Sequence, residues 1–98
     1  MPDYLGQYIL RESPEDNFSM TVDDVFYNFR QLWNTNGFWT IDIFDSDNVI
    51  IISGIRLVAG IYLLNQYPAL RFNILIDTDT DPTYENLELY PLKFYTKD

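Results

Sequence analysis

Alternating carboxylates near the C-terminal end have the clearest spacing for metal chemistry in this chain. Asp77, Asp79 and Asp81 occupy positions one, three and five of a calcium-binding loop of the EF-hand type. Glu85 and Glu88 follow at positions nine and twelve. The sixth position, where the sharp turn needs glycine, is a proline, which cannot adopt the positive φ of that turn. The pattern therefore favours a solvated acidic loop over a calcium site.

A second set of carboxylates, Asp42 and Asp45, could form the acid–base pair that glycoside hydrolysis requires. They belong to one predicted strand, and their odd separation places them on opposite faces of it. Exposed strand carboxylates are therefore the favoured interpretation. The chain contains no histidine and no cysteine, which excludes Ser–His and Cys–His nucleophiles, disulfides and thiolate metal sites. We expect no enzymatic activity, no metal and no cofactor.

Arg56 lies within the longest apolar run of the chain, residues 50–64. An arginine buried without a partner is costly, so its guanidinium needs a carboxylate or must reach the surface. An internal salt bridge is the favoured interpretation. The functional alternative is a salt bridge to a carboxylate of a neighbouring protein, which would couple folding to assembly.

The charge of the chain restricts its partners. Acidic residues outnumber basic ones by 15 to 6, which gives a formal net charge of −9. Binding to nucleic acid requires clustered lysine and arginine, so we expect none. The acidity serves solubility, or it prepares a surface that repels nucleic acid or meets a basic partner. No apolar run reaches the roughly 20 residues that span a bilayer, so we also expect no membrane association and synthesis in a cytoplasm.

The elements that carry these residues are predicted to be strands, because aromatic residues make up 17% of the chain. Apolar and polar residues alternate from Phe18 to Val22, which is typical of a half-buried strand. A two-residue turn at 23–24 would then pair Val22 with Val25 and Phe18 with Phe29. Each of these pairs is apolar, which supports this register.

A second hairpin is predicted around Gly37. A two-residue loop would turn the aromatic residues to the wrong face, whereas a three-residue loop at 35–37 pairs Trp33 with Trp39. Gly37 would then adopt the left-handed conformation of a bulged turn.

The next strand begins the apolar run. An even-length turn pairs Ile50 with Ile43 and Ile52 with Ile41, and Gly54 then falls opposite a tryptophan. The intervening residues are apolar as well, so this strand should be buried on both faces. It is expected to lie in the centre of a closed barrel, or to be covered by the chain ends or by a partner.

The rest of the chain continues the β pattern. We expect a short strand at 8–10, an irregular segment at 59–70, and strands at 71–77 and 89–96. Pro91 within the last strand indicates an edge or a bulge, because proline donates no ladder hydrogen bond. The predicted fold is all-β: one domain spanning 1–98, a small and strongly bent antiparallel meander of about six strands that closes toward a barrel.

Three fragments resemble a known family when they are taken together and in order. They are FRQLWN…GFWTIDIFD, SGIRLVAGIYLLNQY and DTDTDPTYENLELYPLKFY. The family is that of the small baseplate plug proteins of contractile-tailed bacteriophages, described from cyanophage tails. The residues that match its motifs are Arg56, Leu57, Gly60, Leu63 and Leu64, then Asp79, Pro82, Tyr84 and Leu87. The chain departs from the family at 71–73 and at Glu88, where the family has glycines.

This resemblance implies a structural, non-enzymatic component of the virion, made in the host bacterial cytoplasm and located in the tail baseplate. Its expected partners are the hub, spike and tube-end or initiator proteins, and a homo-oligomer within the baseplate is an open alternative. With the surplus of tyrosines, which favour interfaces, it suggests a set of contact residues: Arg56, Leu57, Tyr62, Leu63, Leu64, Tyr67 and Tyr84. The alternative function is a free-standing β-sandwich or barrel module that binds carbohydrate or protein through an aromatic face.

Overall fold

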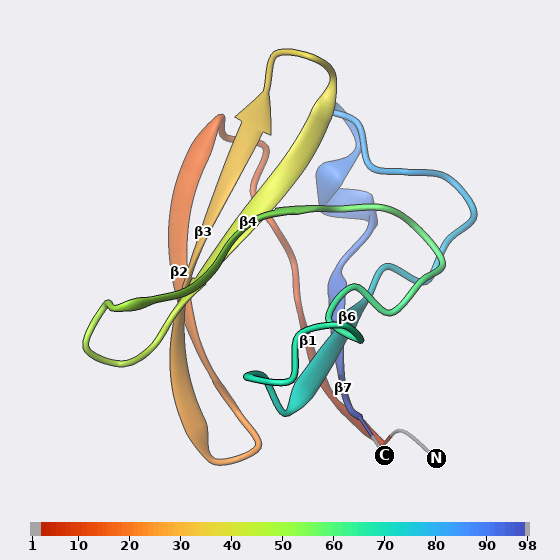
Figure 1. The fold of residues 1–98 in the computed structure, drawn as a ribbon. Coiled ribbons are helices and arrows are strands. Elements are labelled where there is room, and N and C mark those ends of the chain that lie inside the picture. Colours follow the sequence, from red (N-terminus) through yellow and green to blue (C-terminus); the bar gives the residue numbers. More distant parts are fainter. Residues whose placement is uncertain (1–2, 98) are drawn as a thin grey trace.

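Seven strands and one short 3-10 helix form the regular structure of residues 3–97, the part of the chain that this computed structural model describes. Two antiparallel sheets pack face to face (Figure 1). The four-stranded sheet has the order β2-β3-β4-β5, with β2 (Glu15–Val22), β3 (Val25–Asn34), β4 (Phe38–Phe44) and β5 (Ile50–Arg56). The three-stranded sheet has the order β1-β7-β6, with β1 (Tyr4–Tyr8), β7 (Leu92–Thr96) and β6 (Phe72–Leu75).

The all-β class is confirmed, but the sheets do not close into a barrel. The N-terminal strand β1 pairs with β7 instead of joining its sequence neighbour β2. The chain ends thereby build a second layer against the apolar face of the four-stranded meander (Figure 1). A half-buried sheet needs such a layer, because one of its faces is mostly apolar.

Aromatic rings from both sheets form the shared core. The ring of Phe29 in β3 meets Phe94 in β7 at 5.9 Å and Phe72 in β6 at 6.4 Å, both edge to face. Trp39 and Leu10 are also fully buried. Each such side chain removes a large apolar area from water, and edge-to-face pairs add further stabilisation.

The first two hairpins have the predicted registers. Val22 pairs with Val25 and Phe18 with Phe29. The two turn aspartates have φ values of 51° and 66°, which are typical of a type I′ turn. In the second hairpin Trp33 pairs with Trp39, and the glycine of the three-residue loop has a φ of 102°.

The predicted register of β5 is wrong. Ile43 pairs with Ile52, and Ile41 pairs with Ile55. Two bulges place extra residues on β5, and Gly54 lies in one of them with a φ of 72°. The cause is a side chain: the Gly54 N–H donates to Asp42 Oδ1 over 2.8 Å, which takes it out of the ladder.

The position of β5 is also different from the prediction. It is an edge strand of its sheet instead of a central one. Ile50 is 51% exposed, and Val49 just before the strand is 59% exposed. Neither a closed barrel nor the described part of the chain ends covers these side chains, so cover by a partner stays a prediction.

The C-terminal strands lie where the sequence predicted them, but they are shorter than predicted. β6 lies inside the predicted strand 71–77, and β7 starts after Pro91. β7 is the central strand of its sheet, so the edge expected from Pro91 is wrong. The proline costs no ladder bond there, because it precedes the strand. The first strand, β1, begins four residues before the predicted segment 8–10.

The irregular segment predicted at 59–70 is confirmed, and it runs along the free edge of β6. The N–H groups of Gly60 and Leu63 donate to the carbonyls of Ile76 and Ile74 over 2.9 Å and 3.0 Å. The buried Asn73 side chain accepts from the Leu64 N–H over 2.7 Å. This segment therefore satisfies backbone groups that an edge strand would leave open.

Candidate protein-binding surface

The acidic residues 77–88 take part in separate structural contacts. Lys93 Nζ lies 3.3 Å from Asp77 Oδ2, and the Ala59 N–H donates to Asp81 Oδ1 over 2.7 Å. Trp39 Nε1 donates to the Thr83 carbonyl over 2.9 Å, which ties this segment to the four-stranded sheet. Among residues 3–97, no group of three or more acidic side chains has the arrangement of a metal site.

The two strand carboxylates do not form a catalytic pair. Asp42 is buried, so its expected exposure is wrong; its Oδ2 accepts from Arg30 Nε and Nη2 over 3.0 Å and 2.7 Å. Asp45 Oδ1 accepts the backbone N–H groups of Asp47 and Val49 over 2.9 Å each. Each carboxylate therefore holds its own part of the β4–β5 connection in place.

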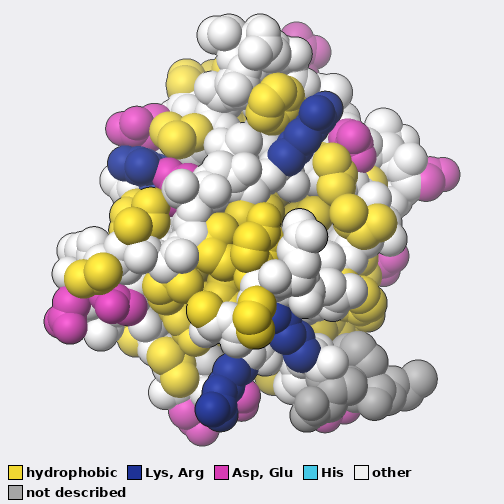
Figure 2. Space-filling view, in the orientation of Figure 1, with side chains coloured by type: hydrophobic (Ala, Val, Ile, Leu, Met, Phe, Trp, Pro, Cys, Tyr) yellow, Lys and Arg dark blue, Asp and Glu magenta, His cyan; other side chains and the backbone are white. Residues whose placement is uncertain are grey.

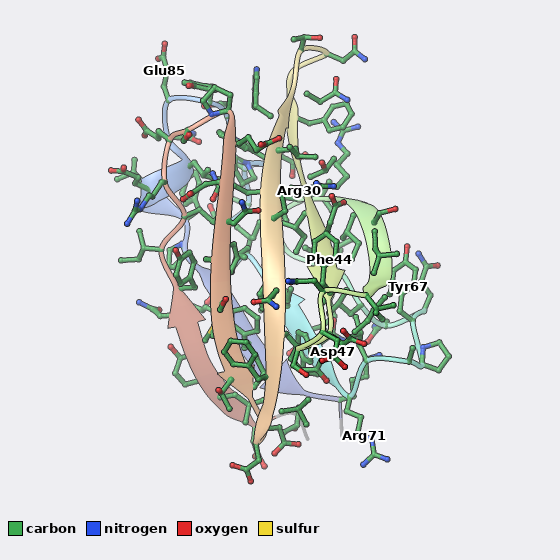
Figure 3. The ribbon with its side chains drawn as sticks, turned by 90° about the vertical axis from the view of Figure 1, so that its left-hand side faces the viewer. Arg30, Phe44, Asp47, Tyr67, Arg71 and Glu85 are labelled. Atoms are coloured by element: carbon green, nitrogen blue, oxygen red, sulfur yellow. The ribbon has the colours of Figure 1, made fainter. Side chains whose placement is uncertain are left out.

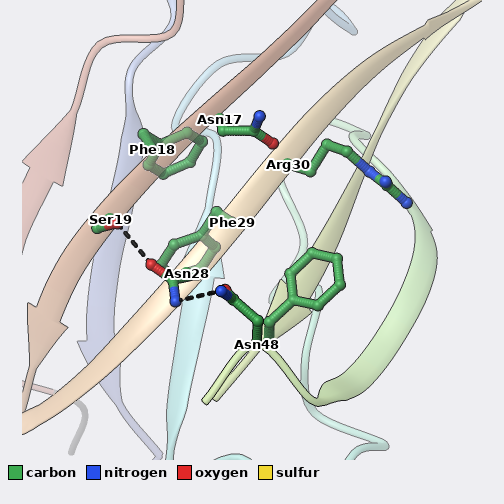
Figure 4. A pocket seen from close by; sticks show the side chains of 8 residues that line it. Asn17, Phe18, Ser19, Asn28, Phe29, Arg30 and Asn48 are labelled. Atoms are coloured by element: carbon green, nitrogen blue, oxygen red, sulfur yellow. Dashed lines mark hydrogen bonds between the residues drawn. The ribbon is translucent and has the colours of Figure 1, made fainter. Parts of the chain in front are cut away.

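A hollow on the outer face of the four-stranded sheet has polar walls that bond to one another (Figure 4). Ser19 Oγ donates to Asn28 Oδ1 over 2.6 Å, and Asn28 Nδ2 donates to Asn48 Oδ1 over 2.8 Å. Asn28 Nδ2 also lies 3.2 Å from the Asp45 carbonyl. The network attaches the β4–β5 turn to β3, which gives these amides a structural role.

Arg56 does not form the expected internal salt bridge. Within the described residues no carboxylate lies within salt-bridge distance of it. Its guanidinium instead lies 4.3 Å from the centre of the Phe38 ring, and the side chain is exposed. Such stacking orients the guanidinium while its N–H donors stay free for a ligand.

A groove of about 500 Å³ opens beside Arg56. We call it the 54–67 groove, because it is lined by Gly54, Ile55, Arg56, Val58, Ile61, Tyr62, Leu63, Asn65, Gln66 and Tyr67. Tyr62 and Tyr67 are half-buried, and the Tyr62 ring meets Tyr95 edge-on at 5.9 Å. A fixed arginine, two ordered tyrosines and an apolar floor have the composition of an interface.

The structure divides the seven predicted contact residues. Arg56, Tyr62 and Tyr67 share the 54–67 groove. Leu57 and Leu64 are buried in the core, and Leu63 is only 8% exposed. Burial therefore leaves these three leucines little surface for a direct contact with a partner.

Tyr84 lies apart from the other predicted contact residues. Its ring stacks on Trp39 at 5.5 Å and meets Trp33 edge-on at 5.3 Å. Sequence reasoning also missed Ile61, Asn65 and Gln66, which line the groove. Their nearness in sequence to Tyr62 and Tyr67 was the available signal.

These features define a class of protein: a small β-sandwich that holds the buried Asp42 and Asn73 side chains in internal hydrogen bonds and has a candidate contact surface on the segment that follows β5. Residues 7–97 match the family model described as "Cyanophage baseplate Pam3 plug gp18". The chain belongs to this family of cyanophage baseplate plugs. No curated protein matches it.

Family membership confirms the resemblance noted in the sequence. It makes the chain a structural protein of the bacteriophage virion, located in the tail baseplate and associated with other baseplate proteins. A structural family favours a non-enzymatic role. Among the described residues, no helix has the length and apolar character needed to cross a membrane.

Proposed function

We propose that this protein is a plug or adaptor subunit that packs against the hub, spike or tube-end proteins through the 54–67 groove. The observation that carries the proposal is Arg56, an exposed arginine on the groove rim that is positioned by Phe38 and has no carboxylate partner in the described chain. A carboxylate of a neighbouring protein would complete it with two parallel hydrogen bonds.

Tyr62 and Tyr67 are the other proposed contacts. Their rings are already held by the fold, so little side-chain entropy is lost when a partner binds. Leu57 and Leu64 support the groove from the core instead of reaching the partner, and Leu63 contributes to its floor. Tyr84 lies outside this surface and is not part of the proposed contact.

The test is replacement of Arg56 by methionine in the phage that encodes this protein. Methionine keeps the apolar stem and a favourable sulfur–aromatic contact with Phe38, so the melting temperature should stay within about 2 °C. Loss of the guanidinium should lower the amount of plug in purified tails about tenfold or more. Quantitative mass spectrometry of tails measures the incorporation, and circular dichroism measures the fold.

Arg11→Met is the matched control. Arg11 is also an exposed arginine, and its side chain lies 3.8 Å from Asp16 in a weak surface pair. Full incorporation of the Arg11 variant and loss of the Arg56 variant would support the proposal. Equal incorporation of both variants would contradict it, as would a monomeric protein that ignores every neighbouring tail protein and binds a glycan.

A further inference from the structure

A second groove continues the 54–67 groove. It has a volume of about 490 Å³, and we call it the 65–71 groove; it is lined by Asp23, Asn65, Pro68, Leu70, Arg71, Thr96 and Lys97. The two grooves share Asn65. Lys97 Nζ also donates to the Tyr67 carbonyl over 2.7 Å, so Tyr67 and Lys97 join the two grooves into one face. Tyr67 and Arg71 lie on the same side of the molecule in Figure 3.

The charge of this face is opposite to that of the whole protein. Arg56, Arg71 and Lys97 line it, which is three of the six basic residues in the chain. Among the described residues that line the two grooves, Asp23 is the one carboxylate. The described residues that line the face, three basic and one acidic, therefore sum to a net charge of +2 in a protein of net charge −9.

The basic residues surround an apolar centre. Ile61 is 54% exposed, and Val58, Tyr62 and Tyr67 are partly exposed beside it. Figure 2 shows hydrophobic side chains gathered in the middle of the molecule, with Lys and Arg side chains above and below them. An apolar centre with a charged rim is the usual anatomy of a protein interface.

We propose that this basic-rimmed face binds a segment of another baseplate protein that is apolar in its middle and carries Asp or Glu on both flanks. This inference rests on the proposed function and names the partner's chemistry. Complementary charge would orient the segment across the two grooves, and like charge would keep basic surfaces of other subunits away. Two copies of this chain, each of net charge −9, repel one another, so the partner is assigned to a different protein.

The environment of Lys97 also favours an acidic partner. Burial lowers the pKa of its ammonium from the ordinary value of 10.5. A partner carboxylate beside it would supply the missing counter-charge and reverse that shift. Within residues 3–97, the carbonyl of Tyr67 is the acceptor of one of the three ammonium protons, and the other two donors have no acceptor there and would be open to the partner.

The test is zero-length carbodiimide cross-linking of intact tails, which condenses a lysine amine with a neighbouring carboxylate to an amide and releases the activated oxygen as a urea. Arg56→Lys and Arg71→Lys keep the charge and place an amine at each end of the face, and Lys97 is native. We expect links from all three positions to Asp or Glu of one other baseplate protein. Lys93, 3.3 Å from Asp77, is the internal control and should link within the chain.

Three outcomes would overturn the inference. In the first, the plug is present in tails, and Lys93 links to neighbouring proteins while positions 56 and 71 do not. This result refutes the binding role of the basic-rimmed face and leaves the proposed function standing. Links to the carboxylates of a second plug copy refute the assigned partner. Tails that contain no plug even with the wild-type chain refute the proposed function and this inference with it.

A charge-reversal pair gives an independent measurement. Arg71→Glu and Arg11→Glu change the net charge equally, but only the first lies on the face. Arg71→Glu should lower incorporation about tenfold and Arg11→Glu less than about twofold. An equal effect of the two variants would overturn the inference, because it would reflect net charge alone.

Discussion

Replacement of Asp42 by alanine should destabilise the protein more than replacement of any other carboxylate in the four-stranded sheet. The Asp42 side chain is 4% exposed and connects three strands. It accepts two hydrogen bonds from Arg30 in β3 and one from the Gly54 N–H in β5. Its loss leaves a guanidinium without its counter-charge and an amide of a bulge without its acceptor.

The magnitude follows from these bonds. A hydrogen bond to a charged group contributes about 1.5–3 kcal/mol. The Arg30 side chain is 40% exposed, so water replaces part of the lost interaction, and about 1 kcal/mol remains for that pair. Loss of the charge-assisted bond from the Gly54 N–H adds about 1–2 kcal/mol, because Gly54 is exposed and water replaces part of that bond. The total of about 2–3 kcal/mol corresponds to a decrease in melting temperature of roughly 10–20 °C for a domain of this size.

Urea unfolding followed by circular dichroism measures this loss as a lower midpoint with an unchanged slope. Asp47→Ala is the control, because Asp47 lies on the exposed β4–β5 turn (Figure 3) and its change should stay within about 0.5 kcal/mol. Arg30→Met combined with Asp42→Ala should cost less than the sum of the single changes. A loss below about 1 kcal/mol for Asp42→Ala would refute the role assigned to its carboxylate.

Two further predictions concern buried polar groups. Asn73→Ala should lower the free energy of unfolding by about 2–3 kcal/mol, because the buried Leu64 N–H loses its acceptor. Asn65→Ala removes only the 2.6 Å bond from Asn73 Nδ2, so it should lower the free energy of unfolding by less than half as much. Urea unfolding measures both changes. Tyr27→Phe should remove a loss of stability at alkaline pH. Burial, above all, raises the pKa of Tyr27 from 10.0; Arg71 lowers it and Asp23 raises it.

The sign of the alkaline effect follows from linkage. The folded pKa of Tyr27 lies above the unfolded value of 10.0, so its stabilising contribution is complete below pH 10.0 and is lost as pH rises through the folded pKa. The lowered pKa of Lys97 acts in the opposite direction and is common to both proteins. Urea midpoints at pH 9 and 11 should therefore fall more for Tyr27 than for its phenylalanine variant. An equal fall in both would contradict the assignment.

Local pattern determined the parts of the fold that depend on neighbours in sequence. Alternation of apolar residues and a short turn set the registers of β2, β3 and β4, because a one-residue slip would turn every apolar side chain to solvent. The order and spacing of motifs also identified the plug family, since both are properties of the sequence itself. The general class, all-β, followed from the aromatic content and the turn residues.

Tertiary contacts determined what the pattern left open. Asp42 withdraws the Gly54 amide from the ladder, so the register of β5 depends on a side-chain bond that no periodicity shows. The pairing of β1 with β7 joins the two ends of the chain, and it decides that β5 is an edge strand. Loop-closing contacts of this kind carry no local signal.

The candidate surface shows the same division. The sequence marked Arg56 as a residue that needs an explanation, since a charge inside an apolar run must find a partner or the surface. Only the fold shows that its support is the ring of Phe38. Only the fold brings Arg71 and Lys97 to the same face, because their distance from Arg56 along the chain is bridged by the packing of the two sheets.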